Sequence, residues 1–201
     1  MAEDDLAALS LAVAPTAENA FRSVATLETA RGARVSAELV TAFVRRSEAS
    51  NRSLRGAEMD ACWTAQADHP DGRRARRLRA RGRAARDAAV GDASPPIWTH
   101  RVLSAVDFNG VGLLYFANLP SLFAAAEHAC LAPFADRFAA IRREIHYFGN
   151  ADCGETLDVS ARVRAAGLAA SAELVVEGAA RRGGDGRVIA TCETTLRVAP
   201  G

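Results

Sequence analysis

The order of segments in residues 97–201 constrains this chain more than any other feature. A strand-like segment at 97–106 comes first, and an apolar helix is expected at 118–131. Four further strand-like segments follow it, and glycines at 154, 167 and 183–186 mark the turns. These four segments cover 139–148, 156–165, 169–176 and 188–198.

The expected helix has one apolar face and many small residues. Asn118 is a good N-cap, and Pro120 is tolerated in the first turn. Its alanines would let a sheet approach closely. An antiparallel sheet wrapped around one buried helix satisfies this order of segments, which is the α+β arrangement called the hot-dog fold. A single unit leaves part of its sheet open, so we expect it to pair with a second unit.

The chain divides by composition into four parts. We expect residues 1–17 to form a flexible tail and 18–70 to supply the strands of a partial N-terminal hot-dog unit. Residues 71–96 are expected to form an Arg-rich connecting helix and linker, and 97–201 the complete unit. In the partial unit, strands are predicted at 21–28 and 34–44.

Eight arginines fall within residues 71–86, although the whole chain has a net charge of only +1 and contains no lysine. One interpretation is a basic surface for nucleic acid, a coenzyme A phosphate or an acidic carrier protein, with binding that weakens as salt rises. The other is a solvated connecting helix. No aromatic residue interleaves with the arginines, which argues against single-stranded nucleic acid.

Several classes of protein are disfavoured by what the sequence lacks. No run of 18 apolar residues is present, so we expect no membrane span. The start is acidic and has no basic flank, which argues against a signal peptide. The four cysteines form no CxxC pair, which is typical of reduced thiols in a cytoplasmic protein. No residues have metal-ligand spacing, so we expect no metal.

Polar and glycine residues gather just before the expected helix. Asp107, Asn109, Tyr115 and Asn118 lie within a dozen residues. Backbone amides near a helix N-terminus can stabilise an oxyanion or a thioester carbonyl, and we expect this role for Gly110–Gly112, that is Gly110, Val111 and Gly112. The segment therefore predicts an acyl-thioester site.

The run Asp-Phe-Asn-Gly-Val-Gly-Leu-Leu-Tyr-Phe-Ala-Asn at 107–118 resembles the loop and helix start of hot-dog acyl-CoA thioesterases of the hydroxybenzoyl-CoA type. Residues 150–157 are similar to that family's next turn, and the resemblance covers roughly 97–198. Asn109 stands where the family has its catalytic carboxylate. An amide can donate and accept hydrogen bonds but cannot act as a nucleophile or base.

A narrower resemblance is to the leinamycin-type double hot-dog acyltransferase/decarboxylases of polyketide biosynthesis. It implies decarboxylation of a methylmalonyl-CoA thioester and delivery of the acyl group to an acyl carrier protein, with no cofactor besides the coenzyme A or phosphopantetheine thioester itself. That family's first unit has its own helix and an acyl-accepting Tyr, and no matching segment is found here. We therefore expect a truncated relative, or one that completes its site as a homodimer or with a partner hot-dog chain.

The remaining candidates leave alternatives open. Glu127 on the expected helix could act as a base, and His146 or its neighbour Tyr147 should face the ligand groove, with His146 as the chosen candidate. His100 and His69 show no partner pattern. The first alternative function is a thioesterase using Asp107 or Glu127 with water. The second is a non-catalytic hot-dog binding or partner subunit.

Overall fold

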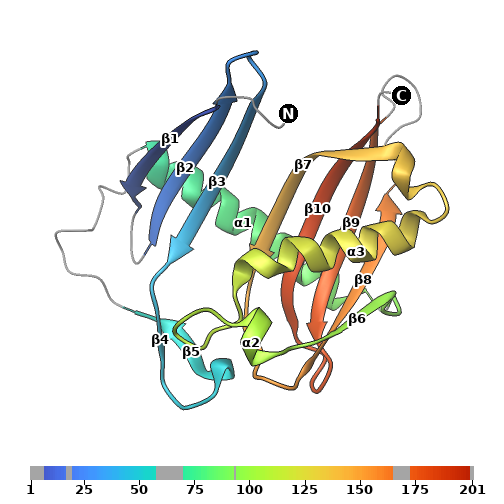
Figure 1. The fold of residues 1–201 in the computed structure, drawn as a ribbon. Helices are drawn as coiled ribbons and strands as arrows, with labels where there is room; N and C mark the ends of the chain where they lie inside the picture. The colour runs from blue at the N-terminus through green and yellow to red at the C-terminus, as the bar shows by residue number, and fades with distance from the viewer. Residues whose placement is uncertain (1–6, 17–19, 58–69, 93, 165–172, 200–201) are drawn as a thin grey trace. The chain divides into compact units, whose positions relative to one another are not determined.

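The computed structural model describes residues 7–16, 20–57, 70–92, 94–164 and 173–199 (Figure 1). The chain divides into two compact units. The first unit comprises residues 1–47 and 54–81, and the second comprises 48–53 and 82–201.

The second unit contains a five-stranded antiparallel sheet. Its strand order is β6-β8-β9-β10-β7. Strands β6 and β7, which follow one another in the chain, therefore lie at opposite edges of the sheet. The strands are β6 (Trp98–Arg101), β7 (Phe138–Tyr147), β8 (Thr156–Arg164), β9 (Glu173–Arg182) and β10 (Val188–Val198).

Helix α3 (Leu119–Leu131) lies across one face of this sheet (Figure 1). Leu119, Phe123 and Ala126 are buried, and they belong to one core with β8 residues Leu157 and Val159. A strand, a buried helix and four antiparallel strands follow one another as the sequence predicts. This unit therefore has the hot-dog fold.

The predicted strand at 97–106 is only partly correct. β6 ends at Arg101, and the chain then forms a short helix, α2 (Ser104–Asp107). The amide of Asp107 donates to the carbonyl of Leu103 at 2.8 Å, and the Asp107 carboxylate accepts the amide of Leu103 at 2.7 Å. This reciprocal pair closes a turn that apolar periodicity does not reveal.

β9 is longer than predicted at its C-terminal end. It continues from the predicted end at residue 176 to Arg182, through small residues that are poor strand formers. At Gly178 an added Cβ would lie 3.0 Å from Cδ1 of Phe123. The strand therefore carries a glycine because α3 packs directly on it.

The first unit contains a three-stranded antiparallel sheet in the order β1-β2-β3. Strand β1 (Ala7–Pro15) pairs along its whole length with β2 (Ala20–Thr29), which pairs in turn with β3 (Arg34–Ala42). The expected flexible tail at 1–17 is thus wrong for Ala7–Pro15, in which Leu9, Leu11 and Val13 recur at every second position, as in a strand. Two short strands, β4 (Val44–Arg46) and β5 (Leu54–Gly56), pair separately.

The Arg-rich segment is helical as predicted, and forms α1 (Pro70–Val90). Small residues, Gly72, Ala75 and Gly82, occupy its buried positions, whereas most of its arginines are exposed. Arg74 forms an ion pair with Glu38 of β3, and hydrogen bonds from Arg74 and Arg22 lower the pKa of Glu38 to about 2. Both interpretations of the Arg-rich segment, a basic binding surface and a solvated connecting helix, stay predictions.

None of the helices among the described residues is long and apolar enough to cross a membrane. Cys130, Cys153 and Cys192 are free thiols. Cys62 and His69 lie outside the described residues.

The close packing of α3 on β9 gives a test of the fold. Replacing Gly178 by Val should lower the free energy of unfolding by about 1–3 kcal/mol, because the side chain would overlap Phe123. Thermal unfolding monitored by circular dichroism measures the change. Gly110→Ala is the matched control, since an added Cβ there meets nothing within 4 Å. Equal stability of the two variants would contradict the packing described.

Candidate functional site

Residues 107–118, here called the site loop, fold back on themselves before α3. The amide of Asn109 donates to the carbonyl of Leu113, and the amide of Gly112 donates to the carbonyl of Asn109, both at 2.9 Å. Phe108 and Leu114 form a β-bridge that closes the base of the turn. Gly112 has φ of +71°, a conformation that favours glycine.

The side chain of Asn109 is part of this turn. Its Oδ1 accepts the amides of Val111 at 3.2 Å and Leu113 at 3.0 Å. The expectation of several free amides across Gly110–Gly112 is therefore wrong for Val111 and Gly112, which donate within the loop. Gly110 borders open space. With Oδ1 fixed, the Nδ2 group of Asn109 is the end of the side chain that can donate to a ligand.

Asp107 is buried and held by neighbouring groups. Its Oδ2 accepts the amide of Leu103 at 2.7 Å and Nε2 of His100 at 2.9 Å. His100 comes from β6 and lies only seven residues earlier. The sequence shows no partner pattern for His100, but α2 turns the chain back toward β6 and brings the two side chains together.

Asn118 does not cap α3 with its side chain, although it occupies the N-cap position. Its Nδ2 instead donates to the carbonyl of Val106 at 3.0 Å and lies 3.5 Å from Oδ1 of Asp107. Asn118 thus ties the start of α3 to the end of α2. This contact fixes the distance between Asp107 and the helix.

Three aromatic rings lie beside the site loop. Tyr115 and Phe116 pack edge to face with centroids 5.3 Å apart, and Phe116 packs on Tyr147 in the same way at 5.9 Å. The hydroxyl of Tyr147 lies 3.4 Å from the carbonyl of Phe116. Although 43% of Tyr147 is exposed, desolvation raises its pKa to about 12, so the phenol stays neutral and able to donate.

Of the two neighbours at the end of β7, Tyr147 faces the site loop and His146 does not. His146 Nε2 hydrogen-bonds Oε1 of Glu144 at 2.9 Å, and an added Cβ at Gly82 of α1 would lie 2.8 Å from its Nδ1. Adjacent strand residues point to opposite faces. Tyr147, and not the expected His146, therefore lies on the face of β7 next to the site loop.

Glu127 on α3 is buried and forms an ion pair with Arg143 of β7. Its Oε2 accepts Arg143 Nη2 and its Oε1 accepts Thr194 Oγ1, both at 2.5 Å. Cys192 lies beside them, and burial raises the pKa of its thiol to about 12. Both carboxylate oxygens of Glu127 are engaged, which argues against its expected role as a base.

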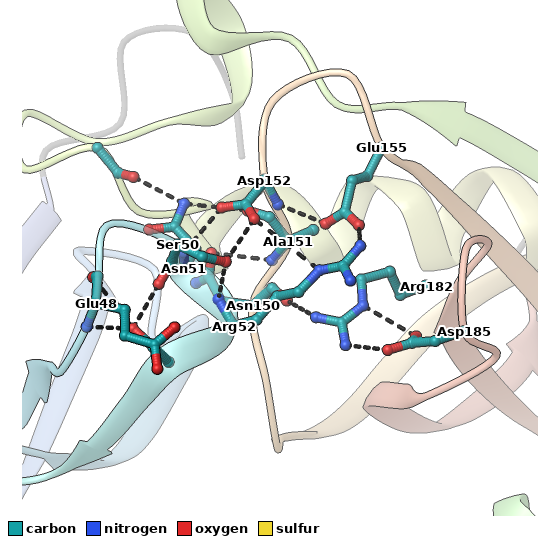
Figure 2. A network of polar contacts seen from close by, with 12 residues as sticks. Glu48, Ser50, Asn51, Arg52, Asn150, Ala151, Asp152, Glu155, Arg182 and Asp185 are labelled. Atoms are coloured by element: carbon teal, nitrogen blue, oxygen red, sulfur yellow. Dashed lines mark hydrogen bonds and ion pairs between the residues drawn. The ribbon is translucent and has the colours of Figure 1, made fainter.

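A polar cluster connects the site loop to residues 48–53 and 150–155, two segments that are far from it in the sequence (Figure 2). Asn150 Oδ1 accepts the amide of Leu114 at 3.0 Å. Asn51, from the 3-10 turn Asn51–Ser53, donates through Nδ2 to the carbonyl of Gly112 at 2.9 Å. Sequence reasoning did not select Asn51, because no local pattern marks a contact across 61 residues.

Across the parts of the chain that the structure describes, no group of three or more His, Cys, Asp or Glu side chains could hold a metal ion. The site loop offers the Nδ2 donor of Asn109, and the His100–Asp107 pair lies at its start.

No family model matches this chain, and no curated protein matches it. Several solved structures are similar to it. One is a candidate thioesterase from Pseudomonas putida KT2440, at 17% identity over 55% of this chain and 75% of that one, with a TM-score of 0.47.

Two others are a thioesterase from Thermus thermophilus with coenzyme A and Zn, and a 1,4-dihydroxy-2-naphthoyl-CoA thioesterase from Synechocystis. The first is 18% identical over 54% of this chain and 83% of that one, with a TM-score of 0.45. The second is 17% identical over 51% and 86%, with a TM-score of 0.43.

Replacement of Glu127 tests whether its carboxylate has a structural or a catalytic role. Glu127→Ala should lower the free energy of unfolding by about 1–3 kcal/mol, because Thr194 and Arg143, whose side chain is 24% exposed, would lose their shared carboxylate partner. Chemical denaturation measures this. Glu144→Ala on the same strand as Arg143 is a comparison with a more exposed ion pair. Full stability combined with loss of thioester turnover would show that Glu127 is catalytic after all.

Proposed function

We propose that this chain is an enzyme acting on acyl thioesters, with Asn109 as the donor to the thioester oxygen. The observation that carries the proposal is the fixed orientation of the Asn109 carboxamide. Two backbone amides hold its Oδ1, so its Nδ2 hydrogens are directed away from the turn. A donor fixed in advance stabilises developing negative charge without reorganisation cost.

The reaction that best suits a neutral donor is decarboxylating acyl transfer from a methylmalonyl-type thioester. The bond between the α-carbon and the carboxylate breaks, and carbon dioxide leaves. The electron pair moves into the thioester and forms an enolate, whose oxygen accepts a hydrogen bond from Asn109 Nδ2. A proton from water then adds to the α-carbon, and the acyl group passes to the thiol of an acyl carrier protein while coenzyme A leaves as the free thiol. A carboxylate at position 109 would repel both the substrate and the enolate.

The other acidic groups near the site loop support this choice. Oδ2 of Asp107 already accepts two hydrogen bonds, and both oxygens of Glu127 are engaged. Neither carboxylate is poised as a nucleophile. The exposed aromatic and aliphatic side chains of the loop, including Val111, Tyr115 and Phe116, offer an apolar surface for an acyl group.

The substrates and partners of this reaction are part of the proposal. Acyl-CoA is the proposed donor and an acyl carrier protein the proposed acceptor. Strand β7 ends the five-stranded sheet and Ile141 on it is 47% exposed, so we propose that this unit works beside a second hot-dog unit, in a homodimer or with a partner chain.

Asn109→Asp tests the role of the donor. Aspartate can accept the same two amides, so the turn is retained while the Nδ2 donor is replaced by a carboxylate oxygen. Incubation with methylmalonyl-CoA, with and without a carrier protein, followed by mass spectrometry, should show decarboxylated acyl product with the native chain. The variant should be slower by about 10²–10³-fold.

The same incubation with malonyl-CoA and saturated acyl-CoAs tests whether the chain acts on other acyl groups or only binds them. An undiminished rate of decarboxylation in Asn109→Asp would rule out Asn109 as the donor. Binding of thioesters without turnover would instead indicate a non-catalytic module. Asn109→Ala removes both the Nδ2 donor and the two turn contacts, so its rate measures the combined effect of losing them.

A second function, hydrolysis of acyl thioesters, is favoured by the pairing of His100 with Asp107. A buried carboxylate that accepts Nε2 of an imidazole orients the ring and makes Nδ1 available as a base for water. The His100 side chain is 26% exposed, so water can reach it.

Replacement of His100 by Gln separates the two functions. If hydrolysis is the activity, release of free acid and coenzyme A should fall by about 10²–10⁴-fold in His100→Gln, because the base is lost. A thiol-release assay measures this. His128→Gln, an exposed histidine on α3, is the matched control. Hydrolysis that persists in His100→Gln would exclude His100 as the base.

A further inference from the structure

Asn51 reaches the site loop from a segment far away in the sequence. Its side chain is 5% exposed, and its Nδ2 donates to the carbonyl of Gly112 at 2.9 Å and to the carbonyl of Ala151 at 3.1 Å. Both hydrogens of the amide group are therefore used. A buried amide with two satisfied donors has one preferred orientation.

The Gly112 carbonyl that Asn51 binds is one end of the peptide group between Gly112 and Leu113. The other end of that group, the amide of Leu113, donates to Oδ1 of Asn109 at 3.0 Å. A peptide group is planar, so fixing its carbonyl also fixes its N–H. Asn51 and Asn109 thus hold opposite ends of a single peptide plane.

Gly112 makes this arrangement sensitive to the hydrogen bond from Asn51. Its φ of +71° lies in the left-handed region, which glycine can leave easily because it has no Cβ. Without the contact from Asn51, rotation of the Gly112–Leu113 peptide would cost little. The Leu113 amide would then leave Oδ1 of Asn109, and the orientation of the Asn109 carboxamide would be lost.

Asn51 is itself held in place by the turn at 150–155 (Figure 2). Its backbone amide donates to Oδ1 of Asp152 at 2.8 Å, and Ser50 Oγ donates to Oδ2 at 2.7 Å. Burial would raise the pKa of Asp152, but these hydrogen bonds and the charges of Arg52 and Arg182 lower it. Asp152 is therefore ionised near neutral pH and keeps Asn51 in register.

We propose that Asn51 is a positioning residue for the site loop, acting through the Gly112–Leu113 peptide to orient the Asn109 carboxamide. The catalytic consequence rests on the proposed function. The structural consequence does not, because the orientation of the peptide can be measured without any substrate.

The first test is hydrogen exchange of backbone amides, resolved by NMR, in native protein, Asn51→Ala and the control Thr99→Ala. Asn51→Ala should lower the protection of the Leu113 amide by about tenfold or more, because a buried donor to Gly112 is removed. Thr99→Ala removes an exposed hydrogen bond to Asp158 in the same unit and should leave Leu113 protected. Unchanged protection of Leu113 in Asn51→Ala would overturn the proposal.

The second test is a double-mutant cycle on thioester turnover with Asn51→Ala, Asn109→Ala and the pair. Asn51→Ala should lower kcat by about tenfold with little change in KM, and the double variant should be no slower than Asn109→Ala alone. Fully additive losses would overturn the coupling. If no thioester is turned over, the proposed function fails while the exchange experiment still decides the role of Asn51.

Asn51→Asp provides a second variant if Asn51→Ala does not fold. Aspartate keeps the size of the side chain but has no N–H donor, so its effect on Leu113 protection should match that of alanine. Retention of native protection in this variant would also overturn the proposal.

Discussion

The contact between α3 and strand β9 is the constraint on which the second unit depends. Phe123 lies against Gly178, where even a Cβ would come within 3.0 Å of the ring. This short distance lets the helix bury Leu119, Leu122 and Ala126 against the sheet. Because the helix position is set by packing, the loop that enters its N-terminus must end at a defined point.

The site loop satisfies that requirement with hydrogen bonds in addition to the core contacts of Leu114 and Phe108. Asp107 and Asn118 join α2 to the start of α3, while Asn109 closes the turn around Gly112. Each of these polar side chains has a defined partner, which limits the freedom of the loop. The outcome is a loop in which the carboxamide of Asn109 and the partly exposed ring of His100 are held in defined positions.

Much of the second unit could be predicted from its sequence because its signals are local. Apolar spacing and glycine turns indicated the strand order in the chain, the helix at Leu119–Leu131 and the hairpin at 183–186. Three of the residues chosen from the sequence, Asp107, Tyr115 and Asn118, are joined by hydrogen bonds in the structure, and their role in a site stays a prediction.

The errors have a shared physical origin in contacts that local patterns do not encode. His100 meets Asp107 only because α2 interrupts the expected strand, and Glu127 is neutralised by Arg143 from β7. The choice between His146 and Tyr147 depended on which face of β7 carries α3. Strand β1 was mistaken for a tail because its pairing with β2 is a tertiary feature that composition does not report.

The hydrogen bonds of Asn51 also bear on the order in which the molecule assembles. They join residues 61 and 100 positions apart in the sequence. Contacts of this kind form late, because closing long loops is entropically costly. The sheet and α3 can therefore form first, and the turn of the site loop reaches its final geometry only when the 48–53 segment docks. Any fragment that begins after this segment would retain the framework of the hot-dog unit without the final setting of its loop.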